Sequence, residues 1–399
     1  MTINEDMTEL AFLDFSRADF STKSQVVRDA REKHWCARTP LGLAILSYEH
    51  VGRFLRDRRL RQGSYSWPNS QNATGSFAEF WQRSLISLEG PQHKKVRALA
   101  IKALSNDFVL TLRSQFNIIA QNLCVILRQK NSCEFQSEFS MPFSGQAICT
   151  LLGLPAERWP SVARDASILG LAMGLNYKTH EVKINAACDR LSELAVELIS
   201  NAKVAPNTSD LVGRLVTYWD QFEGISYQDL IDLIVIVIFG GVDTTRSQLG
   251  FLMALFARYP TQWQDLRIDP SLVPNAVEEA IRAWPTTTWA TREIIESFEF
   301  DGILFAKGVT VHLLVHSSAK DPALGNLPEF DIHLQQRRHH GFGGGAHHCL
   351  GHFVARTDMA SAVRAIANTF KSFSIGGTPV YLPDSGNTSP QILPLSYEV

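Results

Sequence analysis

The sequence lacks the features of several specialised protein classes. Charged residues make up only 20% of its 399 residues and the formal net charge is −2, so we expect no nucleic-acid partner. The chain does not open with a basic segment followed by an apolar one, which predicts no signal peptide. The most apolar run, 230–241, is short and contains Asp232, so we predict a soluble protein without a membrane anchor.

Cysteine is scarce and scattered. The six cysteines form no Cys-x-x-Cys pair, so the common zinc-ribbon and dithiol redox motifs are absent. This pattern is typical of free thiols in a reducing, cytoplasmic environment. The cysteines are Cys36, Cys124, Cys133, Cys149, Cys188 and Cys349.

Hydrophobic residues account for 45% of the chain, and no repeat or low-complexity linker divides it. We therefore expect one domain over 1–399, of which 1–39 are the least informative part. Strand signals are short, at 42–46 and at 298–315, where Asp301-Gly302 indicates a hairpin. The segment 63–76 is typical of a loop. Apolar periodicity predicts helices at 48–56, 91–104, 227–258 and 273–284. The sequence thus predicts a mainly α fold with a minor β part.

The most informative stretch ends in one of the cysteines. It runs Phe-Gly-Gly-Gly-Ala-His-His-Cys-Leu-Gly over 342–351 and precedes an amphipathic run. Glycines at 343 and 345 allow backbone angles that other residues avoid, so a flat group can approach the chain closely. Backbone N–H groups and the dipole of a following helix lower the pKa of a thiol at this position. Cys349 is therefore predicted to be a stabilised thiolate, either a nucleophile or a metal ligand.

Two other interpretations of this stretch stay open on these grounds alone. Cys349 can be a buried structural cysteine after a glycine turn. A zinc ion is the second alternative, since His347, His348, Cys349 and His352 are all possible ligands. Neighbouring ligands on one short loop rarely complete a tetrahedral site without a second cluster, and no such cluster is visible in the sequence.

A second unusual stretch lies inside the predicted helix 227–258. Gly240 and Gly241 are adjacent there, and each costs a helix roughly 1 kcal/mol relative to alanine. Glycines permit a local opening of the helical hydrogen-bond ladder, which makes room for a small ligand. Asp243 and Thr244 then place an acid and an alcohol beside that opening, a pair suited to proton transfer. The plain alternative is a packing pair of glycines beside a solvated aspartate.

The cysteine stretch resembles the heme-binding loop of the cytochrome P-450 superfamily, Phe-Gly-x-Gly-x-His-x-Cys-x-Gly. Six positions match at fixed spacing. The Gly-Gly-x-Asp-Thr stretch is similar to that of soluble, camphor-hydroxylase-like bacterial members, and the resemblance extends from about Pro40 to the C-terminus. It implies a single triangular domain that encloses heme b, with Cys349 as the axial iron ligand. It also implies that Asp243 and Thr244 are the catalytic residues that deliver protons for splitting dioxygen.

The resemblance assigns further residues to the cofactor. It implies that the Glu279-x-x-Arg282 pair is structural and is buried beneath the loop. Many relatives add an arginine from a Pro-x-Arg-Phe segment, but this chain has Glu329 in that place, which puts the usual three-residue network in doubt. The expected heme-binding residues, including propionate partners, are His93, Arg97, Arg292, Phe342, Gly343, His347 and Gly351.

The same resemblance implies an oxygen-inserting enzyme, a monooxygenase, with a mostly apolar substrate pocket. A terpenoid-like or other lipophilic small molecule fits such a pocket. Desaturation, ring closure, C–C cleavage and aryl coupling are alternative outcomes on the same heme. A non-catalytic heme or ligand-binding protein is the alternative of another class, and the intact stretch 241–244 counts against it. The expected pocket residues are Phe80, Leu169, Met173, Ile236, Gly240, Thr287, Thr288, Trp289 and Pro390.

Electrons are expected from a separate protein, because no reductase or flavin segment is visible in the sequence. Basic side chains are expected to gather on the cysteine side of the heme and to attract an acidic ferredoxin or flavodoxin, itself served by a reductase. A generic solvated basic face is the alternative. The residues are Lys94, Lys95, Lys102, Arg337 and Arg338.

Overall fold

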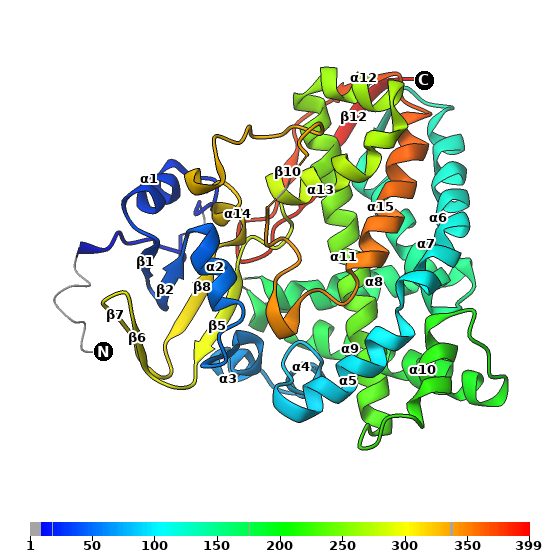
Figure 1. The fold of residues 1–399 in the computed structure, drawn as a ribbon. Coiled ribbons are helices and arrows are strands. Elements are labelled where there is room, and N and C mark those ends of the chain that lie inside the picture. The colour runs from blue at the N-terminus through cyan, green and yellow to red at the C-terminus, as the bar shows by residue number, and fades with distance from the viewer. Residues whose placement is uncertain (1–8, 18, 175, 336–337) are drawn as a thin grey trace.

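The computed structural model describes residues 9–17, 19–174, 176–335 and 338–399. Helices fill one side of the molecule and a small sheet lies at the other (Figure 1). The helices of more than one turn are α1 (Gln25–Lys33), α2 (Tyr48–Phe54), α4 (Ser76–Arg83), α5 (Gly90–Ala103), α6 (Asn106–Leu127), α7 (Met141–Leu152), α8 (Trp159–Gly170), α9 (Tyr177–Val204), α10 (Leu211–Trp219), α11 (Tyr227–Arg258), α12 (Pro260–Ile268), α13 (Val273–Ala283) and α15 (His352–Ala367). Two single turns are α3 (Trp67–Ser70) and α14 (Val315–Ser318). The mainly α fold with a minor β part is confirmed.

Within the described residues, the strands form four small sheets. The largest has the order β1 (Cys36–Thr39), β2 (Gly42–Ile45), β8 (Thr310–Leu313), β5 (Ala290–Ile294) and β3 (Leu60–Gln62). A three-stranded sheet joins β4 (Ser132–Glu134), β12 (Pro394–Glu398) and β9 (Ser372–Ile375). The two-stranded sheets are β6 (Phe298–Phe300) with β7 (Ile303–Phe305), and β10 (Val380–Tyr381) with β11 (Pro390–Ile392).

Helix α11 is the axis around which the other helices pack. It starts at a capping box, in which the Ser226 hydroxyl accepts from the Asp229 N–H and the Asp229 carboxylate accepts from the Ser226 N–H. It ends where Pro260 begins the next helix. Most of its residues are buried, and its buried apolar side chains belong to two large apolar clusters. The predicted bounds of this helix, 227–258, are confirmed.

The predicted hairpin is also present. Asp301 and Gly302 both have positive φ, 47° and 75°, and connect β6 to β7, as a tight two-residue turn requires. The loop predicted over 63–76 is wrong in part, because Trp67-Pro68 begins the one-turn helix α3.

All six cysteines are free thiols, as the sequence predicts. Across the part of the chain that the structure describes, no helix combines the length and the apolar character that crossing a membrane requires.

A fully buried ion pair fixes α13 beneath the cysteine loop. The Arg282 guanidinium donates two hydrogen bonds to the Glu279 carboxylate, at 2.7 and 2.6 Å, and both side chains are 0% exposed. Arg282 also donates to three main-chain carbonyls, those of Ala319, Pro328 and Glu329. Glu279 accepts in turn from the Asp331 N–H at 2.8 Å. Backbone groups of the 328–331 segment therefore complete the network that the sequence left in doubt.

The Glu329 side chain takes no part in this buried network. Its carboxylate accepts from the Tyr259 hydroxyl at 2.9 Å and lies 3.6 Å from the Arg258 guanidinium. An acidic residue is therefore tolerated at 329, because the buried Arg282 uses the carbonyl of this residue and not its side chain.

We predict that Glu279→Gln destabilises the protein by about 3–5 kcal/mol, because it leaves the Arg282 charge buried and unpaired. Urea unfolding of the two proteins measures the difference. Glu197→Gln is the matched control, since it breaks the exposed Arg158–Glu197 pair and should cost no more than about 1 kcal/mol. Equal costs for the two variants would contradict the structural role of Glu279.

Candidate active site

The glycine-rich loop holds Cys349 by hydrogen bonds within its own backbone. The Cys349 N–H donates to the Phe342 carbonyl at 2.8 Å, and the Gly343 N–H donates to the His340 carbonyl at 2.7 Å. Gly343 and Gly345 have φ of 68° and 65°, in the left-handed region. A Cβ atom at Gly345 would lie 2.4 Å from the Leu55 carbonyl oxygen, so only glycine fits between this loop and the end of α2.

The electrostatics of Cys349 differ from the sequence-based prediction. Burial raises the pKa of the Cys349 thiol, although the Gly351 N–H and the guanidinium groups of Arg97 and Arg356 act in the opposite direction. For the protein without a cofactor, the prediction of a lowered Cys349 pKa is therefore wrong. Loss of hydration outweighs the hydrogen bond and the nearby cations. A metal ion at the sulfur would reverse this balance, since coordination deprotonates a thiol outright.

A three-way clamp fastens the loop to α13 and α15. The Glu278 carboxylate accepts two hydrogen bonds from Arg356 of α15 and lies 3.2 Å from His339 Nε2 at the start of the loop. The Arg356 guanidinium also lies 4.4 Å from the centre of the Phe342 ring. Phe342 therefore packs beneath the loop, between the cysteine and the clamp. Sequence reasoning missed Glu278, although it stands directly before the Glu279 motif.

One face of α11 is open although the helix is otherwise buried. Ile236 is partly exposed and Gly240 and Thr244 are exposed, and their spacing of four residues places them on one side of the helix. No atom lies within 4 Å of the position that a Cβ atom on Gly240 would take. The helix continues without a break, so the expected opening of the ladder is wrong. The space comes from the missing side chain at Gly240.

The acid and the alcohol of this stretch have defined partners. The Thr244 hydroxyl donates to the Gly240 carbonyl, which leaves its oxygen lone pairs to face outward. Arg246 donates to Asp243 Oδ1 at 2.6 Å and holds that carboxylate, 29% exposed, at the edge of the open face. The residue after Thr244, Thr245, forms a side-chain hydrogen bond with the buried Asp358 of α15.

The contact between Thr245 and Asp358 shows how the two motifs meet. Asp358 is fully enclosed, and burial raises its pKa well above that of an ordinary aspartate. Helices α11 and α15 lie side by side (Figure 1). Leu350 packs with the same apolar cluster as Ile238 and Val242. The cysteine loop that leads into α15 therefore borders the segment of α11 that carries Thr244.

The four predicted propionate partners gather at this site. The rings of His93 and His347 lie 4.3 Å apart between centroids, and Arg97 donates to the His348 carbonyl. Burial lowers the pKa of His93 to about 4, with further contributions from His347 and Arg97. Arg292 on β5 is 5% exposed, and burial lowers its pKa to about 10.

Two residues that sequence reasoning missed, Glu89 and Gln62, connect His347 to Arg292. Glu89 Oε1 lies 3.2 Å from His347 Nε2 and accepts from the Gln62 N–H at 2.9 Å. The Gln62 side chain on β3 then accepts from Arg292, its partner in the strand register. No local signal marked Glu89 in the sequence, because its partners Gln62 and His347 lie far apart along the chain.

This set of side chains fits the two propionates of a heme. The hydrogen bonds of the buried Arg292 guanidinium go to two neutral oxygens, those of the Gln62 side chain and the Thr291 carbonyl. His93 Nε2 is buried without a hydrogen-bond partner among the described residues. Buried cations and donors in this state call for an anionic group. A zinc ion fits this site less well, because no three potential ligand side chains converge within the described ranges.

The predicted pocket residues fall into two groups. Met173, Ile236 and Thr287 are partly exposed and Gly240 is exposed, as residues lining a chamber should be. Thr287 also donates to the Asn387 side chain at 2.9 Å, which joins two of the segments expected at the pocket.

The other predicted pocket residues are enclosed by protein. Phe80, Leu169 and Thr288 are at most 2% exposed and pack in the core. The Thr288 hydroxyl donates a hydrogen bond to the Asp384 carboxylate. Trp289 differs most from its prediction, because its ring makes tilted and edge-on contacts with Phe15 and Phe20 of the N-terminal segment. The enclosed residues are Phe80, Leu169, Thr288, Trp289 and Pro390.

The structure describes four of the five residues of the predicted basic patch. Lys94, Lys95, Lys102 and Arg338 are exposed, and Lys102 also donates to Gln221 and lies over the Tyr218 ring. Arg337 lies outside the described residues.

The fold and the site together define a helical, heme-dependent oxidoreductase. Comparisons with known proteins agree. The family model described as cytochrome P450 matches residues 173–393. Luteothin monooxygenase of Streptomyces thioluteus is 32% identical over 395 residues, which cover 98% of this chain and 96% of that protein. The 20-oxo-5-O-mycaminosyltylactone 23-monooxygenase of Streptomyces fradiae is 28% identical over 81% of this chain and 75% of that protein.

A solved structure extends the likeness to the fold. The bacillaene polyketide synthase cytochrome P450 PksS of Bacillus subtilis 168 matches with a TM-score of 0.84 and 22% identity, over 94% of this chain and 96% of that one. The chain belongs to the cytochrome P450 family, whose members bind heme b, and it is a monooxygenase.

The clamp predicts a specific acid sensitivity. Burial opposes the charge of Glu278, but hydrogen bonds from His339 and Arg356 lower its pKa from 4.5 to about 2. A carboxylate with a lowered folded-state pKa stabilises the protein fully above about pH 4.5, and this contribution is lost as the pH falls through about 2. We expect wild type to exceed Glu278→Gln in unfolding free energy by about 2–3 kcal/mol at pH 7, and by progressively less below pH 4.5.

Urea titrations at several pH values measure this difference. Glu157→Gln, at an exposed position, is the control and should stay close to wild type throughout. A gap between wild type and Glu278→Gln that is constant from pH 7 to pH 3 would contradict the role given to this carboxylate.

Proposed function

We propose that this monooxygenase inserts one oxygen atom into an apolar secondary metabolite, with Cys349 as the ligand of its heme iron. The observation that carries the proposal is the position of the cysteine loop beside the open face of α11. The heme held there supplies the activation of dioxygen. The protein then has to hold the cofactor, exclude bulk water and place a proton donor.

Asp243 and Thr244 are proposed to provide that proton path. The Thr244 hydroxyl donates a hydrogen bond to the Gly240 carbonyl, so its oxygen is oriented as an acceptor toward the chamber. It can therefore hold a water or a substrate-side hydroxyl in place. The Asp243 carboxylate, half-buried and paired with Arg246, connects this position to the outside.

Arg97, Arg292, His93 and His347 are proposed to bind the propionates. Arginine suits this role because its planar fork matches a carboxylate. Glu89 and Gln62 keep the two sides of this cluster in register, since they connect the heme loop, the start of α5 and strand β3.

The substrate is proposed to be an apolar polyketide-type or comparable lipophilic metabolite. The partly exposed Met173 and Ile236 and the exposed Gly240 offer apolar surface, with Thr287 as a polar handle. The name of the related PksS protein refers to polyketide biosynthesis, which favours this class over the terpenoid first considered.

A separate ferredoxin, or a flavodoxin, is proposed as the electron donor. The exposed Lys94 and Lys95 lie on α5, the helix that also carries His93 and Arg97 of the cofactor cluster. Arg338 adds a charge just before the cysteine loop. A basic surface this close to the cofactor can attract an acidic carrier.

The proton path can be tested with Thr244→Ala. We expect heme content and substrate affinity close to wild type, product formation reduced about tenfold or more, and most of the consumed electrons recovered as hydrogen peroxide. The ratio of product to oxidised NAD(P)H, with a surrogate ferredoxin and reductase, measures this coupling. Mass analysis must show a product heavier by one oxygen.

Thr217→Ala is the matched control. Thr217 on α10 makes the same hydroxyl contact, to the Gly213 carbonyl at 2.7 Å, away from the chamber. Coupling in this variant should match that of wild type. Unchanged coupling in Thr244→Ala would refute the role assigned to Thr244.

A further inference from the structure

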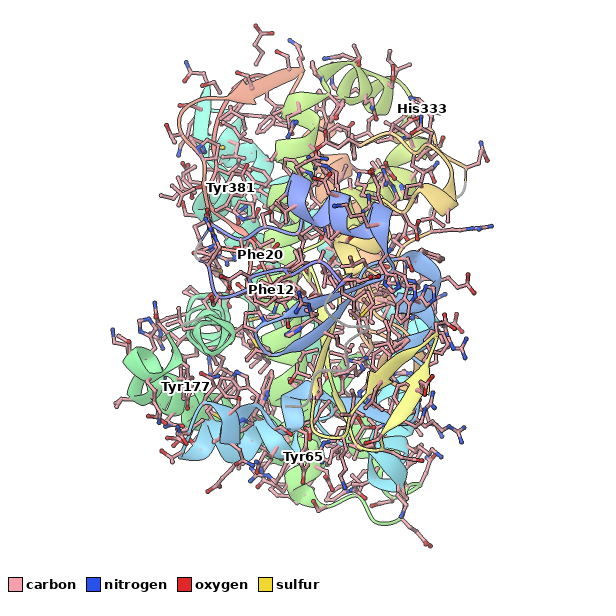
Figure 2. The ribbon with its side chains drawn as sticks, turned by 90° about the vertical axis from the view of Figure 1, so that its left-hand side faces the viewer. Phe12, Phe20, Tyr65, Tyr177, His333 and Tyr381 are labelled. Atoms are coloured by element: carbon pink, nitrogen blue, oxygen red, sulfur yellow. The ribbon has the colours of Figure 1, made fainter. Side chains whose placement is uncertain are left out.

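A second cavity lies on the outer side of the C-terminal half of α11. Its volume is about 290 Å³. It opens where α11, the end of α13, the sheet strands near the C-terminus and the N-terminal segment meet, and Figure 2 shows Tyr381 on this side of the molecule, above Phe20. The lining residues are Lys23, Ala254, Arg258, Trp284, Ile375 and Tyr381.

Two cations share the indole of Trp284 in this cavity. The Lys23 amine lies 3.8 Å from the Trp284 ring centre and 5.3 Å from that of Phe251. The Arg258 guanidinium lies 5.4 Å from the Trp284 ring. The ring of Phe251 is in turn stacked with Tyr381, with 6.2 Å between centroids and 4° between planes. The cavity therefore combines flat aromatic walls with a concentration of positive charge.

Two carboxylates attract the Lys23 amine, but neither hydrogen-bonds to it directly. Among the described residues, no hydrogen bond reaches the Lys23 amine. Burial lowers its pKa to about 8, against the attraction of Asp384 and Glu329. Asp384 already accepts hydrogen bonds from Thr22 and Thr288. Glu329 lies 3.6 Å from Arg258 and accepts hydrogen bonds from Tyr259 and from the Trp284 side chain.

The cavity is distinct from the chamber at Cys349. Ala254 lies ten residues beyond Thr244 on the same helix, which places it about 15 Å further along the axis. The Trp284 ring lines the outer cavity, and its carbonyl accepts from Gln248 within the core at 3.0 Å.

We propose that this outer cavity binds a small planar organic carboxylate. The carboxylate lies between Lys23 and Arg258, and the ring system packs against Trp284 and Tyr381. The volume of about 290 Å³ is at the low end for ligand sites, which suits a molecule of one or two fused rings and not a macrocyclic metabolite. Binding here needs neither heme nor turnover, so it stands apart from the proposed reaction.

The test uses the holoenzyme and 1-naphthoate as the probe, with isothermal titration calorimetry. A saturating heme-ligating azole blocks the inner chamber during the titration. We expect one bound naphthoate per chain, no change in the azole-bound Soret spectrum, and at least about tenfold weaker binding of the neutral analogue 1-naphthalenemethanol.

Variants at the two cations locate the site. Lys23→Gln and Arg258→Gln should each weaken naphthoate binding about tenfold or more. Lys33→Gln, at an exposed position on α1, is the matched control and should bind as wild type does. The heme spectrum of each variant confirms that it is folded.

Several results would overturn the proposal. They are the absence of naphthoate binding to the azole-blocked enzyme, equal binding of the neutral alcohol, and binding that both Lys23→Gln and Arg258→Gln leave unchanged. Because the inner chamber is blocked, none of these results bears on the monooxygenase reaction.

Discussion

The buried carboxylates of α13 are the constraint on which the site depends. Glu279 holds Arg282, which in turn binds three carbonyls of the segments that lead to the cysteine loop. Glu278, one residue earlier, holds Arg356 and His339 on either side of that loop. A cysteine in a glycine-rich turn has little stiffness of its own. Its position is therefore set by two adjacent carboxylates that face different partners.

Charge is distributed in a way that suits an anionic cofactor. The burial of Arg292 and of His93 without anionic hydrogen-bond partners is costly in an isolated protein. Two heme propionates would compensate that cost, so cofactor binding and stability are expected to be coupled. The Cys349 thiol is also expected to depend on the cofactor, because burial disfavours its charged form until a metal ion is bound.

Local signals predicted the parts of the structure that depend on neighbouring residues. The start of the helix at 227 and the turn at Asp301-Gly302 depend on residues close together in the sequence, and both predictions are confirmed. The strand and helix around Gly42 and Tyr48 follow for the same reason. The motif at 342–351 pointed to the correct family.

Contacts between distant segments could not be predicted in the same way. Glu89 and Gln62 join the propionate cluster only because β3 pairs with β5 and α5 approaches the heme loop. Trp289 was expected at the substrate pocket, but its ring packs against Phe15 and Phe20 of the N-terminal segment. A family pattern places the segment near the pocket, whereas the side-chain direction follows from packing.

The most direct test of the account is the carbon-monoxide difference spectrum of the reduced protein, recorded for wild type and for Cys349→His. The account predicts the Soret band that names the family in wild type and a band shifted to shorter wavelength, typical of a histidine ligand, in the variant. A wild-type protein that takes up no heme, or a variant with an unchanged band, would contradict the assignment of Cys349 as the ligand.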